Sequence, residues 1–295
     1  MDRRTFLTLP AAAVAQPGLP EAIRREIESF DGEVFFCARN LGTGAALGYR
    51  ENERVRTAST IKLPIMAAVF DRVRAGKARW EEWIELREED KVSGSGVLRE
   101  LSPGVKLPLR DLVRLMIVVS DNTATNLVLD RITADAVNEF LDTLGLKQTR
   151  ALRKVRGDGA DLKAPSGWSK AGLLEENRRF GLGVSTSREM VELLALLDQG
   201  KVVSPEDSRE MLAILERQQY KDGIGRKLAE YKVASKSGAL DALRSDVGIV
   251  ATPKGKAAMA ITVDGMKTVD YTEDNAGLLL IARLARLLAG CLGIL

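Results

Sequence analysis

Apolar stretches with the character of β-strands lie toward the two ends of the chain. Residues 33–50 alternate apolar stretches around a Gly-Thr-Gly turn, which predicts a β-hairpin. Three more strand-like segments, joined by short turns, follow near the C-terminus at residues 231–240, 245–253 and 256–265. A final apolar run with helical character covers residues 276–295. Because short turns join antiparallel neighbours, whereas parallel strands need long crossovers, these segments predict an antiparallel sheet.

The middle of the chain changes to helical periodicity. Apolar residues recur at intervals of three and four in residues 63–73, 109–119 and 126–145, which predicts helices there. The same spacing predicts a helix at residues 185–200. Residues 147–183 are rich in glycine and charge and show little periodicity. A loop of this length inside a compact domain is usually functional or disordered.

These elements predict an α+β protein, in which an antiparallel β-sheet flanked by helices carries an inserted all-helical lobe. We assign residues 20–295 to this domain. Its sheet lobe takes residues 20–56 and 184–295, and its helical lobe, with the long loop, takes residues 57–183. A chain of 295 residues, 45% apolar and 29% charged, is long enough and apolar enough to bury a large core.

The N-terminus has the features of an export signal. Paired arginines precede a short apolar stretch and a small-x-small site at Ala13–Ala15, which predicts a twin-arginine-like signal over residues 1–15 and a periplasmic or extracellular protein. The C-terminal apolar run is not expected to span a membrane, because Arg283 and Arg286 would each cost about 2.5–3.5 kcal/mol at the bilayer centre. An amphipathic helix packed on the sheet is the better interpretation.

Composition narrows the chemistry that this chain can use. It contains no histidine, which excludes Ser-His-Asp and Cys-His mechanisms and histidine-ligated zinc, so Lys, Glu, Asp or Tyr must carry any acid–base chemistry. The formal charge of +3 is spread without single-sign blocks and gives no argument for nucleic acid. Cys37 and Cys291 lie in apolar segments and are expected to be buried free thiols, although pairing after export stays open. A short basic cluster without interleaved aromatics is interpreted as solvated loop; it comprises Arg150, Arg153, Lys154 and Arg156.

The stretch TASTIKLP places Ser59 and Lys62 at the start of the helical middle. At positions i and i+3 on a helix the two side chains share one face. A serine at a helix start has an outward backbone N–H that can bind an oxyanion, and burial of the lysine beside a second cation would lower its pKa and make it a base. Taken alone, the stretch is explained better by a capping serine with a lysine nearby.

A second motif, SDN at Ser120, Asp121 and Asn122, falls between two predicted helices. In a functional interpretation Ser120 relays a proton, Asp121 holds the turn, and Asn122 offers its amide to a substrate. Asp and Asn are also ordinary caps for the helix that follows, and by itself the tripeptide favours this second explanation.

A third motif, KSG at Lys236, Ser237 and Gly238, lies on a predicted strand. Lys236 and Ser237 can bind a substrate carboxylate, and Lys236 can depress the pKa of a neighbouring lysine. A glycine inside a strand often marks the close approach of a ligand or of another backbone segment. An ordinary exposed strand lysine explains the motif adequately when it is taken in isolation.

In this order, and on a helix start, an interhelical turn and a strand, the three motifs resemble those of the class A β-lactamases and their penicillin-binding relatives. The resemblance covers most of the chain after the predicted export signal. It implies that Ser59 is the acylated nucleophile, that Lys62 accepts its proton or belongs to the relay, and that Ser120 protonates the leaving nitrogen.

The resemblance also implies how a substrate is held. Lys236 and Ser237 would bind its carboxylate, and Arg244 would be a further anchor, with a surface arginine as the alternative. The backbone N–H groups of Ser59 and Ala239 would form the oxyanion hole. The substrate-binding residues implied in this way are Asn122, Ser237, Gly238, Ala239 and Arg244.

One part of the family pattern is missing. In the class A β-lactamases, which this chain resembles, the loop after the helical lobe carries a glutamate in an E-x-x-x-N setting. This glutamate activates the water that hydrolyses the acyl-enzyme. Here Val155 lies near the corresponding position. Glu175 and Glu176 are the nearby candidates, but neither has an asparagine four residues on, and two solvated loop carboxylates are the alternative.

Together these inferences predict a class A-like serine β-lactamase that hydrolyses the amide of β-lactams through an acyl-enzyme on Ser59, without a metal or other cofactor. The alternative is a penicillin-binding DD-peptidase-like hydrolase, or a sensor that forms the acyl-enzyme with little deacylation. The expected partner is a small-molecule substrate, either a β-lactam or a cell-wall peptide. We expect a monomer with no nucleic-acid partner and no stable membrane span.

Overall fold

The computed structural model describes residues 18–157 and 165–295, so the predicted export signal at residues 1–15 lies outside the described residues. The centre of the fold is a five-stranded sheet in the order β2-β1-β10-β9-β8, with antiparallel pairing throughout. The predicted antiparallel sheet, built from both ends of the chain, is confirmed. Its strands are β1 (Glu33–Asn40), β2 (Ala46–Tyr49), β8 (Lys232–Leu240), β9 (Leu243–Thr252) and β10 (Gly255–Asp264).

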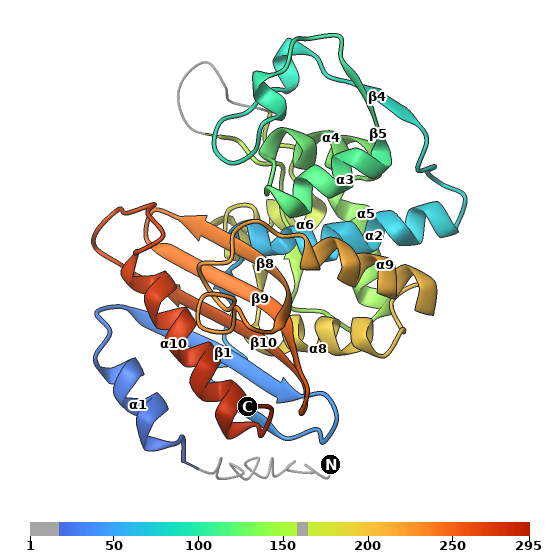
Figure 1. Ribbon diagram of the computed structural model, residues 1–295. Coiled ribbons are helices and arrows are strands. Elements are labelled where there is room, and N and C mark those ends of the chain that lie inside the picture. Colours follow the sequence, from blue (N-terminus) through green and yellow to red (C-terminus); the bar gives the residue numbers. More distant parts are fainter. Residues whose placement is uncertain (1–17, 158–164) are drawn as a thin grey trace, which may run out of the picture.

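Helices cover both faces of this sheet. α10 (Ala276–Cys291) and α1 (Glu21–Glu28) lie on one face, where α10 packs on β9 and β10 (Figure 1). α8 (Ser187–Asp198) packs on the opposite face, against β1 and β10. Arg283 of α10 forms an ion pair with Glu26 of α1 at 2.7 Å, so this charge lies between two helices. In the described part of the chain, no helix is long and apolar enough to cross a membrane.

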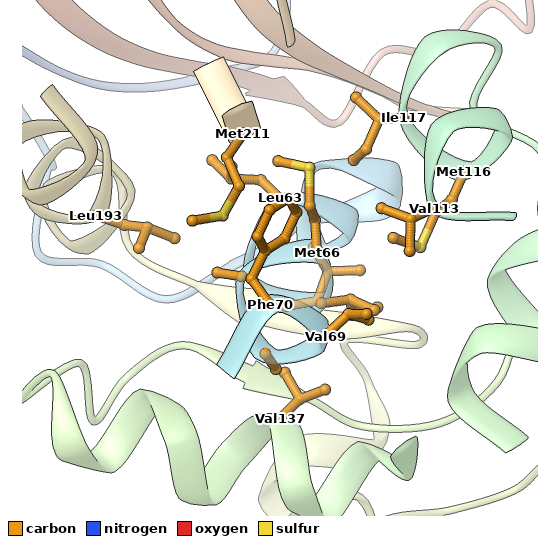
Figure 2. Packing of buried hydrophobic residues seen from close by; sticks show 14 of the residues in the cluster. Leu63, Met66, Val69, Phe70, Val113, Met116, Ile117, Val137, Leu193 and Met211 are labelled. Carbon is orange, nitrogen blue, oxygen red and sulfur yellow. The ribbon is translucent and has the colours of Figure 1, made fainter. Parts of the chain in front are cut away.

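The helical lobe is built around α2 (Lys62–Arg74), which is buried without interruption from Lys62 to Phe70. A helix that is apolar on all sides belongs in a core rather than at a surface. Figure 2 shows Met66 and Phe70 inside a cluster that also takes Val137 and Met211 from other helices. The helices around α2 are α3 (Leu109–Val118), α4 (Asn122–Ile132), α5 (Ala134–Thr143) and α9 (Pro205–Glu216).

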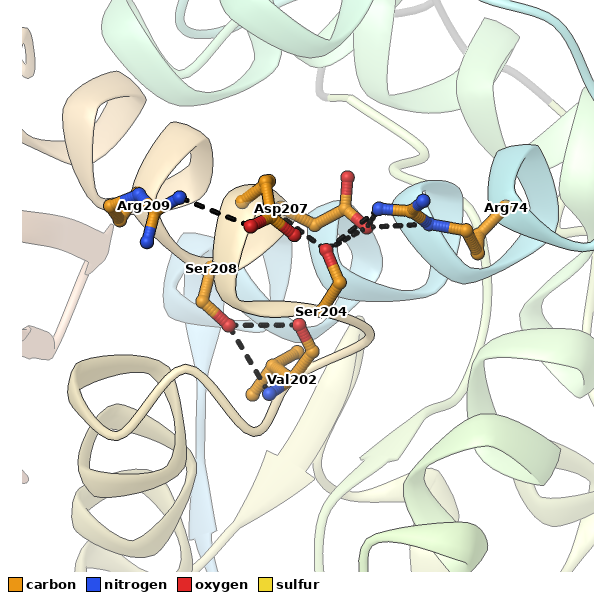
Figure 3. A network of polar contacts seen from close by, with 7 residues as sticks. Arg74, Val202, Ser204, Asp207, Ser208 and Arg209 are labelled. Atoms are coloured by element: carbon orange, nitrogen blue, oxygen red, sulfur yellow. Dashed lines mark hydrogen bonds and ion pairs between the residues drawn. The ribbon is translucent and has the colours of Figure 1, made fainter.

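A polar network ties the C-terminal end of α2 to the N-terminal end of α9 (Figure 3). The Oγ of Ser204 caps α9 by accepting a hydrogen bond from the backbone N–H of Asp207 at 3.1 Å. Arg74 donates to Ser204 Oγ and to Asp207 Oδ2, each at 2.7 Å. The carboxylate of Asp207 also complements the positive end of the helix dipole. The network therefore fixes the helix from which the chain leads to β8.

The long loop between the helical lobe and α8 contains more secondary structure than its sequence predicts. Two short strands near its ends pair with each other, and one of them also pairs with a strand that precedes Ser59. These elements are too short for hydrophobic periodicity to reveal them. They are β3 (Val55–Arg56), β6 (Arg150–Ala151), α6 (Lys170–Leu173), α7 (Glu175–Arg178) and β7 (Gly183–Ser185). Between α2 and α3 lie a two-stranded ribbon and two 3-10 turns: β4 (Trp83–Glu85), η2 (Glu88–Asp90), η3 (Leu98–Glu100) and β5 (Lys106–Pro108).

The apolar pattern over residues 126–145, which predicts continuous helix, belongs to two helices. Thr133 separates α4 from α5 with a φ of +70°, and its hydroxyl accepts a hydrogen bond from the N–H of Ala136 at 3.2 Å as the cap of α5. The prediction was wrong because both helices bury apolar residues in the same core, so the three- and four-residue spacing continues across the break.

Both cysteines are free, and one of them is buried. Burial raises the pKa of Cys37 to about 12, which keeps its thiol protonated and unreactive near neutral pH. Cys291 is exposed at the end of α10, so the expectation of a buried thiol was wrong for this residue.

Candidate active site

Ser59 lies on a single 3-10 turn, η1 (Ala58–Ile61), that leads directly into α2. The cap positions of η1 and α2 are occupied by Thr57 and Ile61, neither of which makes a side-chain cap hydrogen bond. The explanation of Ser59 as a capping serine is therefore wrong. Ala58 has a φ of +46°, and such strain in a non-glycine residue persists only where the surrounding structure imposes it.

Lys62 is fully buried at the start of α2, and its Nζ reaches across to the SDN turn. It donates to the backbone carbonyl of Ser120 at 2.6 Å, to Ser120 Oγ at 3.2 Å and to Asn122 Oδ1 at 2.9 Å. Burial and the neighbouring charge of Lys236 lower the pKa of Lys62 well below its ordinary value, and Asp121 opposes this shift. A lowered pKa favours the unprotonated amine, which is the form that a base requires.

The SDN turn holds Ser120 in a strained backbone conformation, with a φ of +54°. Asp121 is the N-cap of α4, where its Oδ1 accepts from the N–H of Ala124 at 2.8 Å. Its Oδ2 accepts from the N–H groups of Val97 at 2.7 Å and Leu98 at 2.8 Å. The helix-cap explanation is therefore correct for Asp121, which directly follows Ser120.

Asn122 joins the motif to the chain segment that precedes it. Its Oδ1 accepts the hydrogen bond from Lys62, while its Nδ2 donates to the carbonyl of Ser93 at 2.9 Å and its backbone N–H donates to the carbonyl of Ser95 at 2.9 Å. The side chain therefore orients Lys62 and fixes the segment between α2 and α3 at the same time.

The KSG motif brings a second lysine to Ser120 from the edge strand β8. Lys236 is fully buried, and its Nζ donates to Ser120 Oγ at 3.0 Å and to the carbonyl of Ser237 at 2.8 Å. The explanation of an exposed strand lysine is therefore wrong. Burial lowers the pKa of Lys236 to about 7, against the opposing charge of Asp246. Two buried lysines thus converge on one serine hydroxyl, and one of them, Lys62, follows Ser59 by three residues.

Gly238 allows the edge strand to lie directly against the turn that carries Ser59. A Cβ atom at this position would come within 2.8 Å of the Thr57 carbonyl oxygen and 3.0 Å of the Ser59 backbone nitrogen. Real Cβ atoms do not approach backbone so closely, so any larger residue must push the strand and the turn apart. The next residue, Ala239, follows on the same edge strand.

With Ser59 as the expected nucleophile, Gly238→Ala is expected to lower the acylation rate by about 10²-fold, because the added methyl group forces the turn and the strand apart and a misplacement of about 1 Å costs that much. Stopped-flow measurement with a chromogenic cephalosporin gives this rate. Gly290→Ala is the matched control, since nothing lies within 4 Å of a Cβ there. Equal rates for both variants would show that the close approach is not needed.

Arg244 is buried beneath the turn between β8 and β9, so the alternative of a surface arginine does not hold. Its Nη1 donates to the carbonyls of Leu240 at 2.5 Å and Leu243 at 2.6 Å, and its Nη2 donates to the carbonyl of Asp270. The guanidinium carbon also lies 4.7 Å from the centre of the Tyr271 ring. These contacts make Arg244 a brace of the turn that follows KSG.

Val155 is held beside α4 by Asn126, which none of the three motifs includes. Asn126 accepts a hydrogen bond from the N–H of Val155 and donates one to its carbonyl, both at 2.8 Å. Asn126 lies on α4, one helical turn after Asn122. In the sequence, the spacing of four residues from Asn122 was the one indication that Asn126 lies on the same side of the helix. The hydrogen bonds of Asn126 place position 155 against α4, the helix that begins with the SDN motif.

Glu175 and Glu176 both lie on α7 with their side chains in water. The side chain of Glu175 is 83% exposed and pairs with Arg178 at 2.9 Å. That of Glu176 is 70% exposed and lies 3.8 Å from Arg54. These contacts agree with two solvated loop carboxylates. Within residues 18–157 and 165–295, no group of three or more His, Cys, Asp or Glu side chains is placed to hold a metal ion.

The comparisons with known proteins agree with this arrangement. The model of the β-lactamase enzyme family matches residues 18–291. A β-lactamase from Sphaerobacter thermophilus is 32% identical over 93% of this chain and 96% of its own, with a TM-score of 0.79. A PBP-A mutant, solved as an acyl-enzyme complex with penicillin G, is 24% identical over 93% of this chain and 95% of its own, with a TM-score of 0.76.

A β-lactamase from Xanthomonas campestris is 24% identical, covers 91% of this chain and 96% of its own, and has a TM-score of 0.77. This likeness and that of PBP-A show a shared fold. The family match extends from the start of the described residues to the last turn of α10 and includes all three motifs. The chain therefore belongs to the β-lactamase enzyme family.

Proposed function

We propose that the protein is a class A-like serine β-lactamase, which opens the amide of β-lactams through an acyl-enzyme on Ser59. The observation that carries this proposal is the convergence of Lys62 and Lys236 on Ser120 Oγ, at 3.2 and 3.0 Å, beside the turn that bears Ser59. Two buried lysines with lowered pKa values supply both a neutral amine and a cation without any histidine.

Acylation begins when neutral Lys62 takes the proton of the Ser59 hydroxyl and the serine oxygen attacks the lactam carbonyl. The backbone N–H groups of Ser59 and Ala239 stabilise the oxyanion, because Gly238 lets their two backbone segments approach. The lactam C–N bond then breaks, and Ser120 gives its proton to the leaving nitrogen. Ser120 recovers a proton from protonated Lys62, with which it is already hydrogen-bonded.

Substrate binding uses the edge strand. Lys236 and Ser237 hold the carboxylate of the β-lactam, and the charge of Lys236 is available because Asp246 counters the effect of burial. Arg244 contributes indirectly, by bracing the turn after β8 through backbone carbonyls and Tyr271.

Deacylation is expected to limit turnover. Hydrolysis of the acyl-enzyme needs a base for the attacking water. Val155 carries no such group, and Glu175 and Glu176 stand in solvent beside arginines. Water activated by Lys62 alone gives a slower second step than acylation.

We further propose that the protein acts outside the cytoplasm, in the periplasm or beyond, as a monomer that lowers the cell's sensitivity to β-lactams. The paired arginines and the short apolar stretch at residues 1–15 support export. Fractionation of cells that produce the full chain, compared with a version in which Arg3 and Arg4 are replaced by lysine, tests this. Retention of both versions in the cytoplasm would contradict export.

The test of the proposed activity follows chromogenic cephalosporin hydrolysis and intact protein mass in the same reaction. Many turnovers per protein molecule, after a burst that matches the acylation of one site, are expected. A lasting adduct without further turnover would instead support the DD-peptidase-like or sensing alternative. The absence of both an adduct and turnover would contradict the proposal.

A further inference from the structure

A buried carboxylate lies behind the strand that carries Lys236, and no step described above uses it directly. Asp246 is 0% exposed and stands on β9 directly opposite Ser237 of β8. Residues that face each other across antiparallel strands point to the same side of the sheet, whereas successive residues alternate. Asp246 therefore projects to the side of the sheet opposite to Lys236.

On that side, the segment between α9 and β8 closes over the carboxylate. The backbone N–H of Ile224 donates to Asp246 Oδ2 at 2.8 Å. A Cβ atom at Gly223 would come within 2.5 Å of the same oxygen, so the backbone of this segment packs directly on the carboxylate. Asp246 thus fixes the chain that leads into β8, as well as carrying a charge.

Burial of a single charge costs several kcal/mol unless other charges and hydrogen bonds compensate it. Here the compensating charge is that of Lys236, which is equally buried on the facing strand. Burial raises the pKa of Asp246 to about 6, and the charge of Lys236 opposes this shift. The charge of each group therefore favours the ionised form of the other, although Nζ of Lys236 makes its hydrogen bonds to Ser120 and Ser237 on the active-site side.

Other charged groups lie around this Lys236–Asp246 pair. On the active-site side, the charge of Lys236 lowers the pKa of Lys62, and the charge of Asp121 raises it. Arg244, two residues before the carboxylate on β9, directs its guanidinium to backbone carbonyls at the end of the strand. Lys221 and Asp222, on the covering segment, reach solvent, where water and salt screen them.

We propose that Asp246 is a positioning residue for the reaction, which keeps Lys236 protonated from behind the sheet and anchors the edge strand on which Lys236 lies. The inference rests on the proposed function, in which charged Lys236 holds the substrate carboxylate and the Ser120 hydroxyl. When Lys236 loses its proton, the substrate carboxylate loses the cation that holds it. The structure thus links the reactive face of β8 to a charge on the opposite face.

Asp246→Asn tests this role, because the amide oxygen still accepts the Ile224 hydrogen bond while the charge is lost. A nearby negative charge favours the protonated form of a lysine, so its removal lowers the pKa of Lys236. The alkaline limb of the pH profile for Ser59 acylation, measured by stopped flow with a chromogenic cephalosporin, is expected to move down by about one pH unit. The rates of variant and wild type are expected to converge toward the acid end.

Asp222→Asn is the matched control, since it removes a carboxylate of the covering segment that reaches water. Its profile is expected to superimpose on that of the wild type. Thermal unfolding establishes that each variant is folded. An Asp246→Asn profile that also superimposes on the wild type would overturn the proposal.

A second measurement needs neither substrate nor the Asp246 variant. Carbon-13 NMR of labelled aspartate side chains is expected to show the Asp246 carboxyl titrating near pH 6 in the wild type. In Lys236→Gln the titration is expected at higher pH, because the cation that favours the carboxylate is gone. Unchanged titration would overturn the inference, whereas failure of the proposed function would appear separately, as a wild type that is not acylated.

Discussion

Replacing Lys62 with alanine is expected to lower the rate of Ser59 acylation by about 10²–10⁴-fold at neutral pH, the range that a positioned acid–base group contributes. Lys62 is the buried amine that lies one helical turn from Ser59 and donates to Ser120 Oγ. Its loss removes the acceptor for the serine proton and the group that returns a proton to Ser120. Burst kinetics with a chromogenic cephalosporin measure the effect.

Lys62→Arg separates base chemistry from hydrogen bonding. A guanidinium still offers N–H donors at this position but does not release its proton in this pH range, so this variant is expected to be as impaired as Lys62→Ala. Acylation by Lys62→Arg at the wild-type rate would remove the role of base from Lys62. Because the pKa of Lys62 is lowered, wild-type acylation is expected to fall as pH decreases through that pKa and the amine gains a proton.

Replacing Val155 with glutamate is expected to raise the deacylation rate by about 10²–10⁴-fold. The two hydrogen bonds of Asn126 fix the backbone of position 155 against α4, the helix that begins at Asn122. A carboxylate at this position supplies a base for the attacking water. The steady-state turnover after the acylation burst reports the change.

Val155→Gln is the matched control, with the same length and no basic group. It is expected to deacylate at the rate of the wild type, while Val155→Glu shortens the lifetime of the adduct seen by mass spectrometry. If the glutamate and glutamine variants deacylate equally fast, position 155 does not face the hydrolytic water. Acylation rates of both variants serve to show that the first step is intact.

The three motifs could be predicted from the sequence because they are local patterns whose order carries information. Each had an adequate structural explanation alone, and the structure removes two of these explanations. Ser59 caps no helix, and Lys236 is not exposed. For Asp121 the structural explanation is correct, since its carboxylate caps α4, and its role in holding the turn stays a prediction.

The sheet was predictable because its strands are contiguous and joined by short turns. The break between α4 and α5 at Thr133 could not be predicted, because hydrophobic spacing reports which residues are buried and not whether φ is positive. The positive φ values of Ala58 and Ser120 are hidden for the same reason. Positive φ in such residues depends on tertiary contacts that no local pattern describes.

The roles of polar residues that make long-range contacts could not be predicted from the sequence either. Asn126 is an ordinary helical asparagine until the long loop folds back onto it. Asp246 lies between Ser245 and Val247 on a predicted strand, and only the packing of Gly223 and Ile224 shows that it is buried. The sequence left Arg244 with two interpretations, a surface residue or a substrate anchor. In the structure it is buried, and its guanidinium donates hydrogen bonds to backbone carbonyls.

The most direct test of this account is to locate the covalent adduct. The protein is mixed with penicillin G, quenched at short times, digested and mapped by mass spectrometry, alongside Ser59→Ala. We expect one penicilloyl group per molecule, on the peptide that contains Ser59, and no adduct on the variant. An adduct on another residue, or one that persists in Ser59→Ala, would contradict the assignment of Ser59 as the nucleophile and with it the mechanism proposed for this protein.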